Sequence, residues 1–189
     1  MLKVSTETNE VLPGIFVCGR SQVTLERLET HKIRTIITVM GCRLEEKIVS
    51  KVDTYHFFSC EDNMGVDLYS QFPNFVEWIT GGLKNGPVLV HCAAGFSRSV
   101  TAVIAYMIPT FGVTFEKSLA VIQQRRAQAG PNLGFRDQLR KWEVEHLSIA
   151  WTANDAYLLH KKLILRRRRG SFPKIRKIVN RREGRCFLL

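Results

Sequence analysis

Short apolar runs alternate with helix-periodic segments along the first half of the chain. Runs rich in β-branched residues predict buried strands, because such side chains pack well on a pleated surface. These strands are expected over residues 14–19, 33–39, 54–58 and 88–91. Between them, apolar residues spaced three or four apart predict helices over residues 24–31 and 68–83. Strands that alternate with helices predict an α/β fold, with a central, largely parallel twisted sheet flanked by helices.

Helices dominate the second half of the chain. The apolar spacing predicts them over residues 98–110, 115–126 and 134–147. Gly112 follows the first of these helices, and Thr114 is suited to cap the second.

The polar residues 1–8 are expected to be loose, and the composition changes again near residues 150–160. A chain of 189 residues suits one domain with some chain to spare. We therefore expect a single domain over residues 9–150. A helical extension and a basic tail are expected to follow it over residues 151–189.

The net charge of +11 belongs to that tail. Residues 161–189 hold twelve of the 28 lysines and arginines but only one acidic residue, Glu183. The first 160 residues carry sixteen charges of each sign. The high isoelectric point therefore says nothing about the surface of the predicted domain.

The five cysteines form no C-x-x-C pair, and their number is odd. A disulfide framework or a structural zinc site is therefore not expected, and the cytosol or the nucleus fits best. Cys18, Cys42 and Cys60 are expected to be small buried or half-buried residues. An alternative is that Cys42 or Cys60 protects an oxidised Cys92 by forming a disulfide with it.

The most informative segment joins the strand predicted over residues 88–91 to the helix predicted over residues 98–110. It reads His-Cys-Ala-Ala-Gly-Phe-Ser-Arg-Ser over residues 91–99. A loop in this position points its backbone N–H groups at one spot, in front of the positive end of the helix. Such a spot binds a phosphate-like dianion and favours a thiolate over a thiol. Cys92 is therefore expected to be a nucleophile at neutral pH.

This nonapeptide resembles the signature of the dual-specificity phosphatases, a branch of the protein tyrosine phosphatase superfamily, and the chain is similar to their small atypical members. Further similar segments are the opening strand at residues 11–17, the acidic loop around Asp62 and the closing helices from Pro131 onward. Together they cover roughly residues 9–148. The resemblance implies a protein tyrosine phosphatase-like fold and hydrolysis through a phosphocysteine intermediate.

The resemblance also implies roles for the loop residues. Cys92 would attack phosphorus, and Arg98 would hold two phosphate oxygens with its planar fork. Ser99 would help the thiolate to leave in the second step, and His91 would orient the loop and favour the thiolate. The phosphate would be bound mainly by the backbone N–H groups of Ala93, Ala94, Gly95, Phe96 and Ser97, together with Arg98. No metal or cofactor is expected, because Arg98 and the backbone take its place.

Asp62 is the predicted general acid, which protonates the leaving oxygen and then activates water. It lies 30 positions before Cys92 in a polar loop, where the family places its acid. Glu61 and Asp67 are rival candidates, although Asp67 fits better as a helix N-cap. Asn132 is expected either to fix the neighbouring loop by hydrogen bonds or to belong to a plain turn.

The loop composition favours a phosphoprotein substrate, because relatives directed at phosphoinositides usually carry lysines inside the loop. A shallow pocket would accept both phosphotyrosine and phosphoserine or phosphothreonine. The alternatives are a phosphoinositide phosphatase, an RNA 5′-phosphatase, and a pseudophosphatase that binds phosphoproteins without turnover. Intact Cys92, Arg98 and Ser99 argue against the last of these.

The chain finishes in Cys186-Phe-Leu-Leu, which fits a C-a-a-X prenylation box with leucine in the final place. The basic stretch before it is the usual companion, because one lipid chain with a polybasic segment makes a stable anchor. We therefore expect prenylation of Cys186 and association with an anionic membrane surface on its cytoplasmic face. A nuclear import signal or an RNA contact at Arg166–Arg169 is an alternative. Nucleic acid is less favoured, because aromatic residues for base stacking are nearly absent from the tail.

Overall fold

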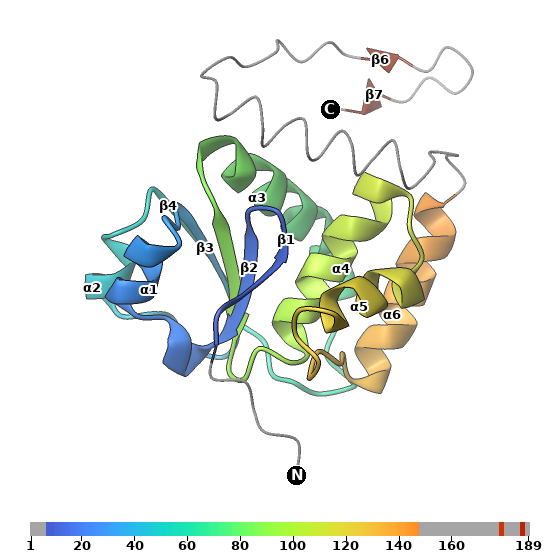
Figure 1. Cartoon of the computed structure of the whole chain (residues 1–189). Coiled ribbons are helices and arrows are strands. Elements are labelled where there is room, and N and C mark those ends of the chain that lie inside the picture. Colours follow the sequence, from blue (N-terminus) through green and yellow to red (C-terminus); the bar gives the residue numbers. More distant parts are fainter. Residues whose placement is uncertain (1–6, 148–177, 180–185, 188–189) are drawn as a thin grey trace.

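A five-stranded sheet forms the centre of the molecule, in a computed structural model that describes residues 7–147, 178–179 and 186–187 (Figure 1). The strand order is β1-β2-β5-β3-β4, and every neighbouring pair is parallel except β1 with β2. The strands are β1 (Asn9–Leu12), β2 (Ile15–Gly19), β3 (Thr35–Val39), β4 (Thr54–Phe58) and β5 (Val88–Cys92). The predicted α/β class with a largely parallel sheet is confirmed.

Helices cover both faces of the sheet. One face carries α1 (Leu25–Thr30) and α2 (Glu46–Val49), and the other carries the four longer helices (Figure 1). These are α3 (Phe72–Asn85), α4 (Arg98–Phe111), α5 (Phe115–Gln123) and α6 (Leu133–His146). Two 3₁₀ turns, η1 (Arg20–Gln22) and η2 (Tyr69–Gln71), precede α1 and α3. No helix among the described residues has the length and apolar character needed to cross a membrane.

Alternate residues of the central strand β5 serve the two sides of the sheet. Val88 and Val90 pack into the core beneath α3–α6, whereas Leu89 packs into the smaller core beneath α1 and α2. All five residues of β5 are buried, as expected for a strand in the middle of a sheet covered on both faces. The strand therefore holds its carboxyl end, where Cys92 lies, in a fixed place.

Side-chain caps fix where the helices begin. Thr24 and Thr114 each accept a hydrogen bond from the N–H three residues later, at the starts of α1 and α5. Gly112 ends α4 in the left-handed conformation, with a φ of 61°. These boundaries agree with the sequence pattern.

Several elements differ from the prediction. The helix expected from residue 68 begins as the 3₁₀ turn η2, and α3 starts at Phe72. α5 ends at Gln123 rather than near residue 126, and both β1 and α2 were missed. Residues 1–6 of the stretch predicted to be loose, and most of the predicted extension over residues 151–189, lie outside the described residues. The last two residues of that stretch, Glu7 and Thr8, accept hydrogen bonds from Arg126 and Arg27. Within the predicted extension the structure describes only a two-stranded pairing, β6 (Ile178–Val179) with β7 (Cys186–Phe187).

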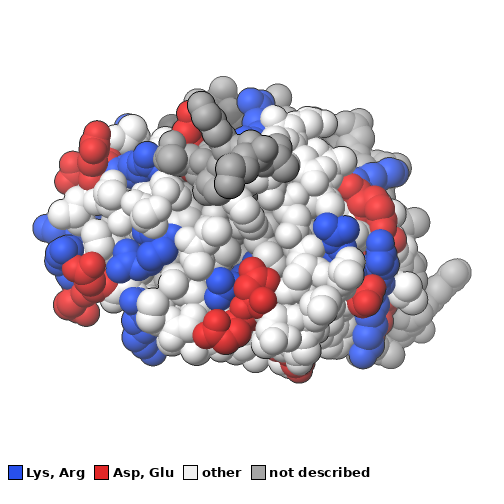
Figure 2. Space-filling model, turned by 90° about the horizontal axis from the view of Figure 1, so that it is seen from below, with Lys and Arg blue, Asp and Glu red and all other residues white. Residues whose placement is uncertain are grey.

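The face at the carboxyl ends of the parallel strands is viewed in Figure 2, which looks up from below Figure 1. Lysine, arginine, aspartate and glutamate side chains are interspersed over it, without a continuous field of one sign. This distribution agrees with the balanced charge of the first 160 residues.

Candidate active site

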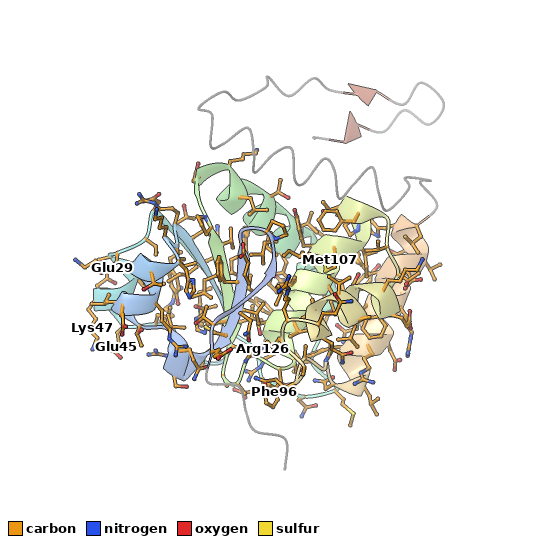
Figure 3. The ribbon with its side chains drawn as sticks, in the orientation of Figure 1. Glu29, Glu45, Lys47, Phe96, Met107 and Arg126 are labelled. Carbon is orange, nitrogen blue, oxygen red and sulfur yellow. The ribbon has the colours of Figure 1, made fainter. Side chains whose placement is uncertain are left out.

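The loop between β5 and α4 lies at the carboxyl end of the sheet, where open α/β sheets bind ligands. Figure 3 shows Phe96 of this loop and Arg126 together at that end. The amino end of the fourteen-residue helix α4 begins directly at Arg98. Its positive end therefore faces the space that a bound anion would occupy.

The carbonyl groups of residues 93–96 are all hydrogen-bonded within the protein. The N–H groups of Arg20 and Gly130 donate to the first and the last of them, at 2.9 Å each. The guanidinium group of Arg126 donates to the two between, those of Ala94 and Gly95. A loop held in this way by its carbonyl groups can keep its N–H groups directed at a ligand.

Cys92 is buried, with 1% of its surface exposed. Its Sγ accepts a hydrogen bond of 3.2 Å from the backbone N–H of Gly95. The Oγ of Ser99 lies 3.3 Å from the same sulfur. Hydrogen bonds to sulfur favour the charged thiolate, so these contacts suit a nucleophile and, later, a leaving group.

Arg98 is buried close to this sulfur site, with 7% of its surface exposed. One terminal nitrogen donates a hydrogen bond of 2.9 Å to the carbonyl group of Cys60. Its Nε is buried without a hydrogen-bond partner and lies 3.6 Å from Oδ2 of Asp62. A buried guanidinium group with a spare donor is ready for an anionic ligand.

Asp62 is the acidic candidate that the structure brings to the loop. Its Oδ1 accepts hydrogen bonds of 2.8 Å from both the Ser97 hydroxyl and the Asn132 side-chain amide. The rival Glu61 instead directs its carboxylate at the backbone of Gly41, where an added Cβ would lie 2.7 Å from its Oε1.

The other rival, Asp67, accepts a hydrogen bond from the N–H of Ser70, as a capping residue does. Asn132 makes both kinds of contact considered for it. It caps α6 through a hydrogen bond from the N–H of Phe135, and it fixes the neighbouring loop through Asp62.

His91 is fully buried, and burial lowers its pKa to about 4. Its Nδ1 lies 3.3 Å from the carbonyl oxygen of Cys92, which can only accept, so Nδ1 carries the proton. Its Nε2 then accepts a hydrogen bond of 2.7 Å from the hydroxyl of Thr38. In this neutral form the ring connects the carboxyl end of β5 to β3 through hydrogen bonds.

The cysteines outside the loop differ from the prediction at one place. Cys18 and Cys60 are buried, but Cys42 is exposed, because it follows β3 in a surface turn. Burial raises the pKa of the Cys18 and Cys60 thiols, to about 12 and about 11. All four cysteines in residues 7–147 are free, so the proposed protective disulfide stays a prediction.

Two contributors to this site escaped the sequence analysis, namely Thr38 and Arg126. Thr38 belongs to a strand that reads as ordinary buried sheet. Arg126 follows two other polar residues at a helix end, where arginines are normally exposed. A pattern of spacing cannot show that either side chain reaches the loop. Among residues 7–147, no cluster of three or more His, Cys, Asp or Glu side chains is placed to hold a metal ion.

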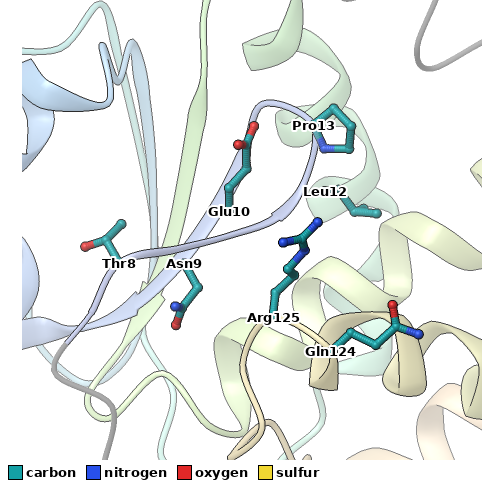
Figure 4. A pocket seen from close by; sticks show the side chains of 7 residues that line it. All are labelled: Thr8, Asn9, Glu10, Leu12, Pro13, Gln124 and Arg125. Carbon is teal, nitrogen blue, oxygen red and sulfur yellow. The ribbon is translucent and has the colours of Figure 1, made fainter.

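A hollow of about 570 Å³ lies on another part of the surface (Figure 4). It is formed by β1, the turn after it and the end of α5, and Arg125 points into it. None of the predicted site residues lines it. The site at Cys92 therefore does not share this hollow.

The fold and the site together define a cysteine-centred phosphate-binding protein of the tyrosine phosphatase type. Residues 15–145 match the family model described as the dual specificity phosphatase catalytic domain. The chain therefore belongs to the dual specificity phosphatase family, as the nonapeptide predicted.

Some similar proteins are named as phosphatases, and others are named as interacting or phosphatase-like proteins. A MAP kinase phosphatase with leucine-rich repeats from Dictyostelium discoideum is 35% identical over 150 residues, which cover 77% of this chain but 17% of that protein. The serine/threonine/tyrosine-interacting protein of mouse is also 35% identical over 150 residues, which cover 75% of this chain and 67% of the mouse protein. The crystal structure of the human tyrosine phosphatase-like serine/threonine/tyrosine-interacting protein superposes with a TM-score of 0.70 at 33% identity. It covers 76% of this chain and 99% of the solved chain.

Proposed function

We propose that this chain is a cysteine-dependent dual-specificity protein phosphatase, which hydrolyses phosphotyrosine and phosphoserine or phosphothreonine through a phosphocysteine intermediate. The single observation that carries the proposal is the convergence of three groups on one loop. These are the buried sulfur of Cys92, the spare Nε donor of Arg98 and the carboxylate of Asp62. Family membership supports the same chemistry.

In the first step, the thiolate of Cys92 attacks phosphorus while the bond from phosphorus to the leaving oxygen breaks. Protonated Asp62 gives its proton to that oxygen, so the product leaves as a neutral alcohol or phenol. Arg98 and the loop N–H groups hold the charge that is spread over the remaining phosphate oxygens.

In the second step, the Asp62 carboxylate takes a proton from a water molecule as its oxygen bonds to phosphorus. The phosphorus–sulfur bond breaks, and Cys92 leaves as a thiolate. The Ser99 hydroxyl, 3.3 Å from the sulfur, donates a hydrogen bond to the charge that develops there. Inorganic phosphate is released, and Asp62 is again protonated.

Turnover on a matched set of substrates tests this proposal. The set comprises phosphotyrosine and phosphothreonine peptides, short-chain phosphoinositides and a 5′-triphosphate RNA, with Cys92→Ser as the control. We expect turnover of both peptides that disappears in the variant. If only a phosphoinositide or only the RNA were turned over, the substrate class would be lipid or RNA rather than protein.

A second candidate is a binding module that recognises phosphoproteins without turnover. It is favoured by the relatives whose printed names say "interacting" and "tyrosine phosphatase-like" rather than phosphatase. The presence of Cys92 at the end of β5 favours the enzyme. If the parent protein turned over none of the substrates but bound a phosphopeptide, the binding module would be established instead.

We propose in addition that Cys186 is prenylated and holds the protein at an anionic membrane surface on the cytoplasmic face. The proposal rests on the Cys-Phe-Leu-Leu sequence and on the twelve basic residues between positions 161 and 185. Each basic residue close to an anionic leaflet adds about 1 kcal/mol at most.

The mass of the intact protein from eukaryotic cells tests this second proposal. We expect the increments of a geranylgeranyl group and a methyl ester, with loss of Phe187–Leu189, in the parent protein. Cys186→Ser should lack them and should no longer sediment with membranes. An unmodified Cys186 would refute prenylation and leave nuclear import or RNA contact as the role of the basic tail.

A further inference from the structure

The guanidinium group of Arg126 is buried directly behind the phosphate-binding loop. Only 1% of the residue is exposed, and Figure 3 shows it at the carboxyl end of the sheet, close to the loop. It donates four hydrogen bonds, at 2.7 and 3.1 Å to the carbonyl groups of Gly95 and Ala94, and at 2.7 and 3.2 Å to Asn9 Oδ1 and the carbonyl group of Glu7. These contacts fix both the loop and the first strand.

All four acceptors are neutral oxygens, so within the described residues the hydrogen-bond partners of Arg126 supply no counter-charge. A buried cation without a carboxylate partner is costly, and such a residue needs a compensating anion or a functional reason. Burial lowers the pKa of Arg126, while the nearby thiols of Cys18 and Cys92 act in the opposite direction. The anions that this cation could compensate on the loop are therefore the thiolate form of Cys92 and a bound phosphate.

One peptide group connects this cation to the sulfur. Arg126 Nη2 donates to the carbonyl group of Ala94, and the N–H of the same peptide group, which belongs to Gly95, donates to Cys92 Sγ at 3.2 Å. A cation at the carbonyl end of a peptide dipole strengthens the donor at the other end, because chained hydrogen bonds polarise one another. Arg126 Nε acts in the same way on the peptide group between Gly95 and Phe96.

The loop sequence accommodates this contact at Gly95. That residue has a φ of 71°, and an added Cβ would lie 2.6 Å from Arg126 Nη2 and 2.6 Å from the backbone carbonyl group of Cys18. Only glycine allows both the backbone conformation and the close approach of the guanidinium group. Gly95 and Arg126 therefore form one structural unit.

We propose that Arg126 is a positioning residue, which holds the loop N–H groups toward the phosphate and supplies part of the positive potential that keeps Cys92 ionised. This inference rests on the proposed function for its purpose. Its direct consequence, however, concerns the ionisation of Cys92 and can be measured without any substrate.

Three variants distinguish the effect of the Arg126 charge from that of its hydrogen-bond geometry and from a general effect of replacing an arginine in this segment. Arg126→Met keeps the length of the side chain but removes its charge and donors. Arg126→Lys keeps the charge without the planar fork. Arg125→Met is the matched control, because Arg125 is the neighbouring arginine but is exposed and points into the surface hollow (Figure 4).

The measurement is the rate at which neutral iodoacetamide alkylates Cys92, taken in steps from about pH 4 to pH 9 and followed by the mass of the peptide that contains it. Cys92→Ser corrects for the other thiols. The midpoint of the parent's rate–pH profile is located first, and the ratio compared is the rate one pH unit below that midpoint divided by the rate at pH 9. A rise of one unit in the midpoint lowers this ratio about tenfold, and we expect a fall of that order in Arg126→Met. The fall should be smaller in Arg126→Lys, and Arg125→Met should keep the parent ratio.

An unchanged ratio in Arg126→Met, with only a lower melting temperature, would overturn the inference and leave Arg126 a structural residue. An equal fall in Arg125→Met would overturn it as well. If Arg126→Met does not fold, Arg126→Gln, which removes the charge but keeps amide donors, takes its place, and a parent-like ratio there refutes the inference. If Arg126→Met lowered the ratio but the parent protein hydrolysed no phosphopeptide, this inference would stand and the proposed function would fail. If the parent protein hydrolysed phosphopeptides but Arg126→Met left the ratio unchanged, the proposed function would stand and this inference would fail.

Discussion

The hydroxyl of Ser97 donates a hydrogen bond of 2.8 Å to Oδ1 of Asp62. The same oxygen of Ser97 accepts a hydrogen bond of 3.1 Å from the backbone N–H of Asn132. One serine therefore joins the loop after β5, the loop that carries Asp62 and the start of α6. The side chain of Asp62 is 33% exposed, so its position depends on these contacts rather than on burial.

The replacement Asp62→Asn should lower kcat on phosphotyrosine peptides by about 10²- to 10⁴-fold, the usual contribution of a positioned general acid. The loss should be much smaller for p-nitrophenyl phosphate, because its leaving oxygen needs little protonation. Steady-state kinetics on the two substrates measures this difference.

The matched control is Glu61→Gln, which alters the adjacent carboxylate that faces Gly41. We expect its kcat on both substrates to stay within about twofold of the parent, because general-acid catalysis requires hydrogen-bond reach of the reacting oxygen. If Glu61→Gln lost more kcat on phosphotyrosine peptides than on p-nitrophenyl phosphate and Asp62→Asn did not, Glu61 rather than Asp62 would be the general acid.

Asn132 has two separable functions, since its Oδ1 caps α6 and its Nδ2 donates to Asp62. Asn132→Ala removes both and should lower the free energy of unfolding by about 1 kcal/mol. Asn132→Ser retains a capping oxygen but is too short to reach Asp62. We expect nearly the parent stability in Asn132→Ser, with kcat reduced about tenfold in both variants by loss of a hydrogen bond to a charged group. Parent-like kcat in both would show that Ser97 alone positions the acid.

Gly134 in the first turn of α6 lies against the backbone of the acid loop. A Cβ at this position would come within 2.0 Å of the carbonyl oxygen of Met64, so Gly134→Ala must displace that loop. A displacement near 1 Å can cost about 10²-fold in rate, and we expect a loss of that order in kcat on phosphotyrosine peptides.

The control for this helical glycine is Gly81 in α3, where an added Cβ meets nothing within 4 Å. Gly81→Ala should raise the free energy of unfolding by about 0.5–1 kcal/mol and leave kcat unchanged, because alanine loses less backbone entropy in a helix. Equal kinetics for the two alanine variants would contradict the proposed contact between Gly134 and the acid loop.

The parts of the fold that the sequence predicts well are those with local causes. The cap at Thr114, the left-handed Gly112 and the nonapeptide after β5 each carry a short-range signal that tertiary contacts do not override. The strand β1 was missed because its polar residues Asn9 and Glu10 hide the alternation at the edge of the sheet. The helix α2 has four residues, too few to show a helical period.

The parts of the site that the sequence does not predict depend on long-range contacts. Arg126 meets the carbonyl group of Gly95, 31 positions earlier, and Thr38 meets His91, 53 positions later. Arg126 meets a backbone carbonyl group, which leaves no mark on residue identity, and Thr38 lies in a strand that reads as ordinary buried sheet. Neither contact could therefore be inferred from spacing. Asp62 was predictable only through the family resemblance, since Glu61 has the same chemistry one position away.

The buried His91 makes the stability of the protein depend on pH in a defined window. In the folded chain its pKa is about 4, whereas an exposed histidine has a pKa near 6.5. Between these values the unfolded chain binds more protons than the folded one, so stability falls as the pH falls from about 6.5 toward 4. Above that window both states are neutral at this residue, and His91 contributes no pH dependence.

The replacement His91→Gln removes this titration while its side-chain oxygen can still accept from Thr38. Lowering the pH from 7 to 5 should cost the parent protein about 2 kcal/mol more unfolding free energy than it costs the variant. Urea unfolding of both proteins at the two pH values measures this difference, in which the shared carboxylates cancel. A variant that loses as much stability as the parent would mean that His91 takes up its proton in the folded state. The ring would then carry a charge beside Cys92, and it would favour the thiolate by electrostatics rather than by orienting the loop.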